Sequence, residues 1–292
     1  MRRKEGDAGA TPTKLCSGSG AAVAARPLII ATCPVRWRLL LTPPLSGPEN
    51  MALDVALMAR ARRTGEAVAR VYGWSTPTLS FGRNERAVER FDAAAIAGAG
   101  LEVVRRPTGG RALLHHRELT YSVTAPAGDS LVASCRRITA HLINALEQLG
   151  VPATVAAAGG RHAPTAQGPC FAEPSAGELV VAGRKLAGSA QWRHDGALLQ
   201  HGSILIDDDQ SAIAALRRER AMLPVAAPPP PATLRALLGR PPSTEEFAGA
   251  WFHAIRESED PGAEEWAAEP EVLREARALG DSFRAPDWTW RR

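Results

Sequence analysis

The segment from residue 178 to residue 207 constrains the fold more than any other part of this 292-residue sequence. It holds three runs in which apolar side chains alternate with small or polar ones, divided by Ala182-Gly183 and by Asp195-Gly196. Asp-Gly between two alternating runs is a strong signal for a two-residue hairpin turn, because both turn positions adopt a positive φ. The sequence therefore predicts three strands in a meander.

The second turn also sets which side chains share a face of the sheet. If residue 194 pairs with residue 197, then Lys185, Ser189 and Gln191 lie on one face together with Gly202. That face is small and polar, which leaves room for a ligand along the strand. The opposite face is apolar and carries His201, which we interpret as a hydrogen-bonded core residue. A bulge at the neighbouring glycines would reverse this assignment.

The other periodic segments mix strands and helices in irregular order, which favours an α+β architecture over a doubly wound sheet. Asn50 is the expected N-cap of the first helix. Strands are predicted at residues 68–74, 78–81, 102–106 and 118–124, and helices at residues 50–58, 92–99, 134–149, 211–222, 242–258 and 270–279.

Composition divides the chain into four parts. Residues 1–35 are rich in small residues and predict a disordered extension, whereas residues 36–223 hold the main domain. Residues 224–231 contain five prolines and predict a linker, and residues 232–292 predict a small helical C-terminal piece. The formal net charge of +4 comes from residues 1–36, since the rest has 29 basic and 29 acidic side chains. That balance gives no argument for a nucleic-acid partner.

Cysteine usage and hydropathy favour a cytoplasmic protein with no metal and no membrane partner. No stretch approaches the ~20 apolar residues that a membrane-spanning helix needs. The pair His115-His116 lacks a third ligand at the spacing of a zinc site. The four cysteines are scattered without metal-ligand spacing at Cys16, Cys33, Cys135 and Cys170.

Lys185 is the only lysine after Lys14, in a chain with three lysines and 32 arginines. It lies among glycines and other small residues in the segment 183–191, directly after an arginine. An ammonium is a compact charge on a thin stem, whereas a guanidinium is a planar fork. We therefore interpret Lys185 as a catalytic residue that directs its charge at one atom.

Cys170 is the candidate nucleophile. It follows Pro169 in a predicted loop, 15 residues before Lys185, so a strand and a turn can bring the two into one cleft. A nearby ammonium favours the thiolate, which is the attacking form of cysteine.

Residues 105–111 (RRPTGGR) place Gly109 and Gly110 at the end of a predicted strand. Backbone amides exposed there could bind a carboxylate, a phosphate or a developing oxyanion. A Gly-Gly pair alone is weak evidence, because most such pairs are turns, but the flanking arginines and the following His115-His116 strengthen the prediction. Those arginines (Arg105, Arg106 and Arg111) could also form a basic rim with Arg83 and Arg86, suited to acidic proteins.

Six segments in one order resemble the lipoate/octanoate protein ligases and transferases, which are relatives of biotin protein ligase. They are residues 50–54, 80–84, 105–111, 118–122, 183–191 and 199–205. The resemblance implies a biotin/lipoate protein ligase-like catalytic domain, a mixed and largely antiparallel sheet with flanking helices. It also implies that the lysine contacts the acyl carbonyl and that the glycine loop lines the acyl pocket. The expected substrate-binding residues are Arg83, Arg106, Thr108, Gly109, Gly110, Arg111, Ser189, Gln191 and Gly202.

Within that family, Cys170-Phe171 and the C-terminal residues 287–292 look most like cysteine-dependent octanoyltransferases. The resemblance implies transfer of octanoyl from acyl carrier protein, through an acyl-enzyme on Cys170, to a lysine of a lipoyl-domain protein such as the glycine cleavage H protein. No cofactor is needed, because a thioester is already activated. Two departures from the family pattern stand at Ala176-Gly177, where bulky aromatics are expected, and at residues 115–117.

Three alternatives stay open. The first is an ATP-dependent lipoate-protein ligase that uses Lys185, ATP and Mg²⁺ and has no need of Cys170. The second is transfer of a lipoyl group from one protein lysine to another, which would also use Cys170. The third is a non-catalytic relative or a DNA-binding regulator, but residues 1–36 are too rich in Gly and Ala to build a helix-turn-helix.

Overall fold

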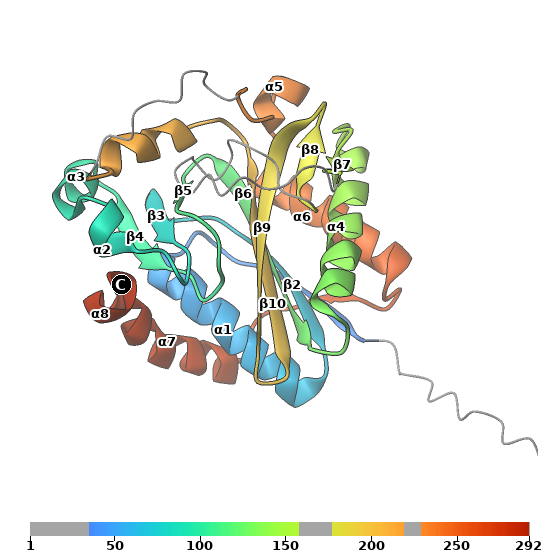
Figure 1. Ribbon diagram of the computed structural model, residues 1–292. Coiled ribbons are helices and arrows are strands. Elements are labelled where there is room, and N and C mark those ends of the chain that lie inside the picture. The colour runs from blue at the N-terminus through green and yellow to red at the C-terminus, as the bar shows by residue number, and fades with distance from the viewer. Residues whose placement is uncertain (1–34, 158–176, 219–228, 292) are drawn as a thin grey trace, which may run out of the picture. The chain divides into compact units, whose positions relative to one another are not determined.

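The computed structural model describes residues 35–157, 177–218 and 229–291. Its central feature is a mixed sheet with the strand order β11-β1-β2-β6-β10-β9-β8-β7 (Figure 1). Two neighbouring pairs are parallel and the other five are antiparallel, so the α+β prediction with a largely antiparallel sheet is confirmed. The strands are β1 (Trp37–Leu41), β2 (Ala67–Tyr72), β6 (Glu118–Pro126), β7 (Thr154–Val155), β8 (Leu179–Val181), β9 (Arg184–His194), β10 (Ala197–Leu205) and β11 (Glu264–Glu265).

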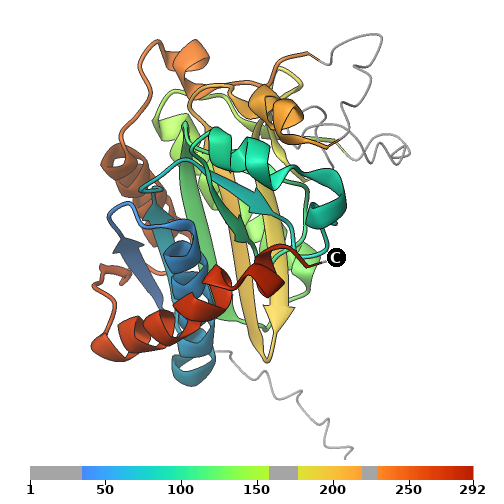
Figure 2. The ribbon, with the colours of Figure 1, turned by 90° about the vertical axis from the view of Figure 1, so that its left-hand side faces the viewer.

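Helices cover both faces of this sheet. α1 lies between one face and α7, and α4 and α6 pack together on the other face (Figures 1 and 2). The main core, on the α4 and α6 side, includes Trp37, Leu142 and Trp251. The helices are α1 (Gly47–Thr64), α2 (Ala87–Arg90), α3 (Ala93–Gly98), α4 (Leu131–Gln148), α5 (Leu234–Leu238), α6 (Thr244–Ser258), α7 (Pro270–Arg284), α8 (Pro286–Thr289) and a 3-10 helix at Gln210–Leu216.

The first helix begins earlier than predicted, and Asn50 is not its N-cap. Ser46 is the N-cap, and its amide donates to Glu49 Oε2 at 3.0 Å. Asn50 lies one turn inside the helix, where its side-chain amide donates to the Gly73 carbonyl at 3.0 Å. The residue therefore ties α1 to the end of β2 instead of capping the helix.

The hairpin of β9 and β10 has the predicted turn and register. Asp195 and Gly196 have φ values of 48° and 75°, as a two-residue turn of this kind requires. His194 pairs with Ala197, and Ser189 pairs with Gly202 further along the ladder. The three-stranded meander is therefore confirmed.

The predicted face for Lys185 is wrong, because β9 contains one extra residue opposite β8. Leu179 pairs with Ala187 but Val180 pairs with Lys185, so Leu186 is inserted as a β-bulge. Leu186 and Ala187 both lie in the main core under α4 and α6. Beyond the bulge the alternation is reversed, and Lys185 lies on the face that α1 covers.

A small second sheet carries the glycine loop. It has the order β4-β3-β5, with β3 (Thr78–Phe81), β4 (Glu102–Arg105) and β5 (Leu113–His115), and the loop joins β4 to β5. Gly82 follows β3 and packs directly on this loop, since a Cβ at Gly82 would lie 1.9 Å from the Gly110 carbonyl oxygen. The Arg83 amide adds a hydrogen bond of 2.7 Å to the Thr108 carbonyl. These contacts fix the shape of the loop.

The C-terminal residues, expected as a helical appendage, are built into the same unit as the main sheet. The predicted helices are present as α6 and α7. β11 extends the main sheet beside β1, and Phe247 and Trp251 of α6 are fully buried in the main core. Of the expected extension and linker, residues 1–34 and 224–228 lie outside the described residues.

Candidate active site

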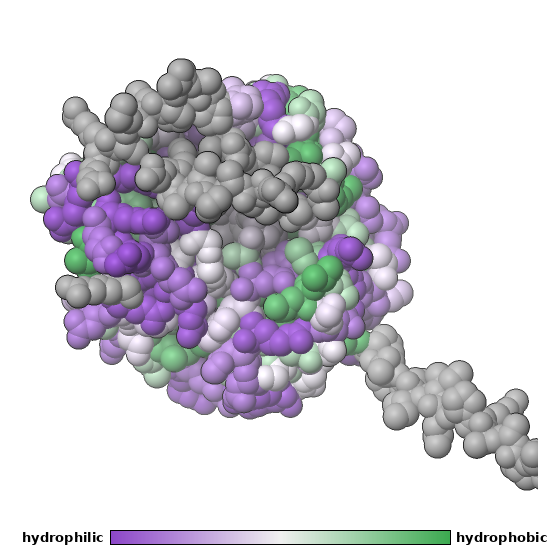
Figure 3. Space-filling model, in the orientation of Figure 1, coloured by the Kyte–Doolittle hydropathy of each residue, from purple (hydrophilic) through white to green (hydrophobic). Residues whose placement is uncertain are grey.

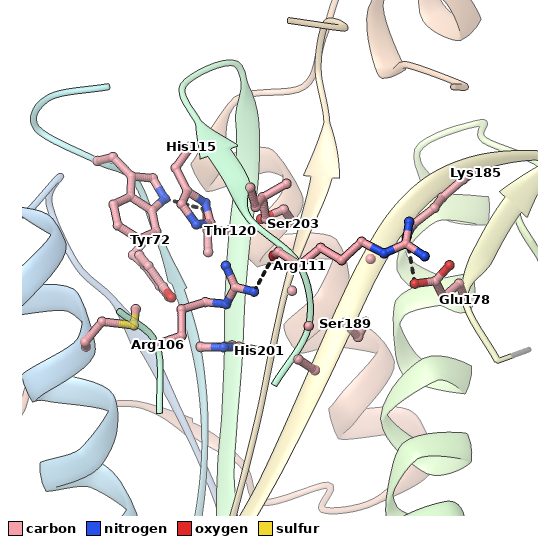
Figure 4. Close-up of a pocket in the computed structure, with 17 residues that line it drawn as sticks. Tyr72, Arg106, Arg111, His115, Thr120, Glu178, Lys185, Ser189, His201 and Ser203 are labelled. Atoms are coloured by element: carbon pink, nitrogen blue, oxygen red, sulfur yellow. Dashed lines mark hydrogen bonds and ion pairs between the residues drawn. The ribbon is translucent and has the colours of Figure 1, made fainter. Parts of the chain in front are cut away.

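A pocket of about 190 Å³ lies between the main sheet, α1 and the glycine loop (Figure 4). It opens on the face of β9 and β10 that carries His201, so the predicted ligand face is wrong and the bulge explains the difference. Of the predicted site residues, the pocket is lined by Arg106, Gly110, Arg111, Lys185, Ser189 and Gly202.

Lys185 is buried at one end of the pocket and forms an ion pair with Glu178. Nζ donates to Glu178 Oε1 at 2.7 Å, and only 2% of Lys185 is exposed. A buried ammonium is costly unless it is paired, so Glu178 allows a positive charge to stay in this site. The side chain of Arg111 extends to the same end, beside both groups (Figure 4). This end of the pocket can stabilise negative charge on an oxygen atom.

Glu178 is a site residue that the sequence analysis missed. It stands directly before β8, at the first position of the segment predicted as three strands, where an acidic residue is ordinary. The bulge that turns Lys185 toward this carboxylate has no pattern of its own in the sequence. The one available signal is that an isolated buried lysine needs an acidic partner.

The other end of the pocket carries polar as well as apolar side chains. Tyr72, Arg106 and His115 lie there, away from Lys185, in the close-up (Figure 4). Met51, Trp74 and Leu113 add apolar surface to the lining of the pocket. Burial raises the pKa of Tyr72 well above its ordinary value, so its hydroxyl stays protonated and neutral. The apolar part of the lining suits a fatty acyl chain whose carbonyl lies at the lysine.

Arg106 holds the glycine loop together from beneath. Its guanidinium donates to the Gly109 carbonyl at 3.2 Å and to the Arg111 carbonyl at 2.9 Å. It also donates to the main-chain and side-chain oxygens of Ser80 on β3. Because these carbonyls are turned toward Arg106, the residue shapes the loop as well as lining the pocket.

His201 anchors the loop from the side of the main sheet. His201 Nδ1 lies 3.4 Å from Asp54 Oδ2, and Nε2 lies 2.6 Å from Thr108 Oγ1. Burial lowers the pKa of His201 below its ordinary value, so the ring is neutral and the carboxylate fixes its proton on Nδ1. Nε2 then accepts from Thr108. The prediction of a hydrogen-bonded core histidine is confirmed, and the same residue also lines the pocket.

Asp54 stays ionised although it is fully buried. Its Oδ1 accepts from Arg70 Nη1 at 2.8 Å and from Ser122 Oγ at 2.8 Å. Burial alone would raise the pKa of Asp54, but the hydrogen bond from His201 and the charge of Arg70 outweigh it and lower that pKa. On the α1 side, the pocket is therefore supported by the buried ion pair of Asp54 and Arg70.

A second histidine–carboxylate pair, also missed from the sequence, supports the loop from the small sheet. His115 Nδ1 lies 2.6 Å from Glu118 Oε1, and its Nε2 lies 2.7 Å from Ser80 Oγ, the hydroxyl that Arg106 contacts. The ring of His115 stacks on Trp74 at 3.9 Å between centroids. The pair His115-His116 lacks the third ligand of a zinc site, and its pattern gave no signal for this packing role.

Two predicted binding residues direct their side chains away from the pocket. Ser189 Oγ pairs with Tyr121 Oη at 2.6 Å, and the Gln191 and Gln200 side-chain amides pair at 2.7 Å. Tyr121 belongs to the main core, on the α4 and α6 side. Gly202 lets the Tyr121 ring cross the strand, since a Cβ there would approach this ring to 2.8 Å.

The predicted basic rim needs correction at Arg105, which is fully buried. Its guanidinium donates to carbonyls of the turn after β3, with Gly82 at 2.8 Å, and to carbonyls of the C-terminal segment, with Trp288 at 2.9 Å. Burial and the nearby charge of Arg291 lower the pKa of Arg105 to about 10. Arg105 thus holds two chain segments together and is not available to a partner protein.

Cys170 lies outside the described residues, so its place relative to Lys185 stays a prediction. The description resumes at Gly177, and Glu178 already lines the pocket. Eight residues of chain can span up to about 26–29 Å, which is ample to reach the lysine.

Across residues 35–157, 177–218 and 229–291, no group of three or more His, Cys, Asp or Glu side chains is arranged to hold a metal ion. In the same ranges, none of the helices has the length and apolar character needed to cross a membrane.

Comparison with known proteins agrees with this geometry. Residues 46–256 match the family model of the lipoyl protein ligase A/B catalytic domain. The chain is 39% identical over 271 residues to octanoyltransferase LipM of Kyrpidia tusciae, covering 88% of this chain and 99% of that protein. It is 45% identical over 183 residues to octanoyltransferase LipM of Symbiobacterium thermophilum, where the match covers 59% of this chain and 65% of that protein.

Solved structures share the fold. Lipoate-protein ligase A bound with ATP superposes with a TM-score of 0.71 at 21% identity, covering 88% of this chain and 99% of that one. The bipartite lipoate protein ligase of Thermoplasma acidophilum gives a TM-score of 0.68 at 21% identity, covering 88% and 96% of the two chains.

Proposed function

Because the chain belongs to the lipoyl protein ligase A/B catalytic domain family, we propose that it is a cytoplasmic octanoyltransferase of protein lipoylation. It takes octanoyl from the thioester of octanoyl-acyl carrier protein and transfers it to a lysine of a lipoyl-domain protein, such as the glycine cleavage H protein. The observation that carries the proposal is the Lys185–Glu178 pair at the end of a partly apolar pocket, in a chain that matches a named octanoyltransferase over almost all of that protein's length.

The reaction has two steps, and Cys170 is the proposed nucleophile in the first. Its thiolate attacks the thioester carbonyl, the bond to the carrier sulfur breaks, and the carrier thiolate leaves and takes up a proton. In the second step, the amine of the acceptor lysine attacks the acyl-enzyme carbonyl. An amide forms, the amine loses a proton, and the Cys170 thiolate is released. Charges and atoms balance without a nucleotide or a metal.

Lys185 supplies charge stabilisation in both steps. The carbonyl oxygen becomes negative in each tetrahedral intermediate, and a buried ammonium stabilises such an oxyanion more strongly than an exposed one. Arg111 reaches the same end of the pocket and adds positive charge there (Figure 4). The glycine loop holds the acyl chain against the apolar part of the pocket lining, with its carbonyl at these cations.

The decisive experiment is a single-turnover assay without acceptor. Incubation with octanoyl-acyl carrier protein should add the mass of one octanoyl group to the protein, on Cys170, as read by intact mass and peptide mapping. Cys170→Ser should form no thioester adduct. The matched control is Cys135→Ser, which changes a partly exposed cysteine on α4 and should still be acylated on Cys170. Normal transfer to an acceptor by Cys170→Ser would contradict the mechanism.

A substitution at the lysine tests its shape as well as its charge. Lys185→Arg should lower the rate of acyl-enzyme formation nearly as far as Lys185→Ala, by about two to three orders of magnitude. The physical reason is that a guanidinium fork does not fit between the strand and Glu178 where the thin stem does. Retention of most activity by Lys185→Arg would show that only the charge matters.

One specific observation favours a second function, an ATP-dependent lipoate-protein ligase. The fold superposes on a lipoate-protein ligase that binds ATP, and Lys185 and the glycine loop could serve an acyl-adenylate. Omission of ATP separates the two. Octanoyl transfer from the carrier protein without ATP supports the transferase, whereas acylation only with free lipoate, ATP and Mg²⁺ supports the ligase.

A further inference from the structure

Two partly exposed arginines lie together beside the glycine loop, and neither forms an ion pair with an acidic side chain of the described residues. Arg291 Nη2 donates to the Arg83 carbonyl at 2.8 Å, and Arg83 Nη1 donates to the Pro107 carbonyl at 3.4 Å. Each guanidinium lies over an indole ring. Arg83 is 5.2 Å from the centroid of Trp192, and Arg291 is 4.1 Å from that of Trp288.

This arrangement differs from that of the neighbouring arginines. Arg86, three residues along the chain, pairs with Glu89 at 2.6 Å, and Arg90 pairs with Glu85 at 2.9 Å. At Arg291, burial and the charge of Arg83 lower the pKa, so two like charges face each other, with no acidic side chain of the described residues between them. Such a pair is favourable when an anion from outside the chain binds to both.

The two arginines are also held in place. Arg105, fully buried beneath them, donates to the carbonyls of Arg83 at 3.2 Å and Arg291 at 2.9 Å. Stacking on indole rings restricts the guanidinium groups further, which reduces the entropy lost when a ligand binds. The C-terminal segment and the turn after β3 therefore form one preorganised surface.

This surface lies next to the pocket. Arg83 follows Gly82, which touches Gly110, and Gly110 lines the pocket. Trp192 is two residues along β9 from Ala190, which lines the pocket too. Hydrophilic side chains gather on this side of the molecule, around α2 and α8 (Figure 3).

We propose that Arg83 and Arg291 form an anion-binding site that docks the acidic surface of the carrier protein delivering the acyl group. The inference rests on the transferase function proposed above. The carrier must bring its thioester to the pocket, and carboxylates on its surface can accept bidentate hydrogen bonds from the two guanidinium groups. The phosphate of a phosphopantetheine arm has the same anionic chemistry, and the experiment separates the two sources.

The test compares three donors that differ in one group at a time: octanoyl-pantetheine, octanoyl-phosphopantetheine and octanoyl-acyl carrier protein. Arg291→Gln and Arg83→Gln should each raise the KM for the carrier protein about fivefold, and the double variant should raise it further. The rise in KM should be larger for the carrier protein than for either small donor. Added salt should raise the KM of the wild-type protein for the carrier protein more than that of the double variant.

Arg240→Gln is the matched control, since Arg240 is exposed and paired with Glu246 at 2.7 Å and has no place in the predicted basic rim, and its KM values should stay unchanged. An equal rise in KM for octanoyl-phosphopantetheine and for the carrier protein would overturn the docking assignment and show that the site binds the phosphate. An equal rise in KM for all three donors, or no rise for the carrier protein, would overturn the anion site itself.

Binding of an unreactive carrier protein, with an amide in place of the thioester, keeps this test independent of turnover. The wild-type protein should bind it more tightly than the double variant, as measured by calorimetric titration. If the wild-type protein binds this carrier but transfers nothing, the docking site stands and the transferase proposal fails. If it transfers octanoyl and the variants bind equally well, the docking proposal fails alone.

Discussion

Two histidines hold the glycine loop from opposite sides, and they differ in how the carboxylate behind each ring is neutralised. Asp54, behind His201, is fully buried and forms an ion pair with Arg70. Glu118, behind His115, accepts three hydrogen bonds at Oε1, from His115, Thr120 and Ser203, while its Oε2 has no partner. No arginine or lysine pairs with it among the described residues.

This difference indicates two kinds of support for one loop. The Asp54 side is a closed electrostatic unit, in which loss of one member leaves a buried opposite charge. The Glu118 side is a hydrogen-bonded unit that can lose a charge while keeping its geometry. The main sheet therefore supplies stability, and the small sheet supplies the orientation of Ser80 and Arg106.

The largest effect is expected at Asp54. Asp54→Asn leaves Arg70 buried without its counter-charge and should lower the free energy of unfolding by about 3–5 kcal/mol, as measured by urea denaturation. The double variant Asp54→Asn/Arg70→Met removes the orphan guanidinium and should regain part of this loss. A single variant as stable as the wild-type protein would contradict the closed-unit interpretation.

An intermediate effect is expected from acid. The unfolded chain binds a proton at His201 near the ordinary pKa of 6.5, whereas burial lowers the folded-state pKa. Below pH 6.5 the unfolded state therefore holds more protons, and the free energy of unfolding falls with pH by at most about 1.4 kcal/mol per pH unit from this group. His201→Gln should remove this part of the pH dependence, because glutamine does not titrate. Its side-chain amide can still bond Thr108 and Asp54, so the fold is kept. An unchanged slope would mean that another group titrates.

The smallest effect is expected at Glu118. Glu118→Gln keeps the oxygen that accepts the three hydrogen bonds, and no arginine or lysine of the described residues pairs with this carboxylate, so stability should change by about 1 kcal/mol or less. Thermal unfolding alongside Asp54→Asn makes the comparison direct. A loss as large as that of Asp54→Asn would show that Glu118 also neutralises a buried positive charge.

Local turn chemistry explains how far the fold could be predicted from the sequence. Asp195-Gly196 specifies a hairpin by its own backbone preferences, so the pairing of β9 with β10 could be predicted residue by residue. The bulge at Leu186 could not, because it depends on how β9 pairs with β8. A register argument that extends from one strand pair to the next accumulates such errors.

The candidate site shows the same limit. Arg105 and Arg106 are adjacent and identical in the sequence, yet one binds the C-terminal segment and the other binds the glycine loop. Both arginines are buried, so only the alternation of side-chain direction along the chain distinguishes them. Glu178 escaped prediction because its role depends on a contact with a residue on another strand.

The bulge also bears on how this site can be lost. Regular pairing of β8 with β9, with Leu186 in the ladder and no bulge, would keep every side chain of the site in the chain. It would nevertheless turn the ammonium of Lys185 toward α4 and α6, away from Glu178 and the pocket. For this protein, an inventory of matching residues is therefore not sufficient to recognise an active relative, and the pairing register of β8 with β9 has to be preserved as well.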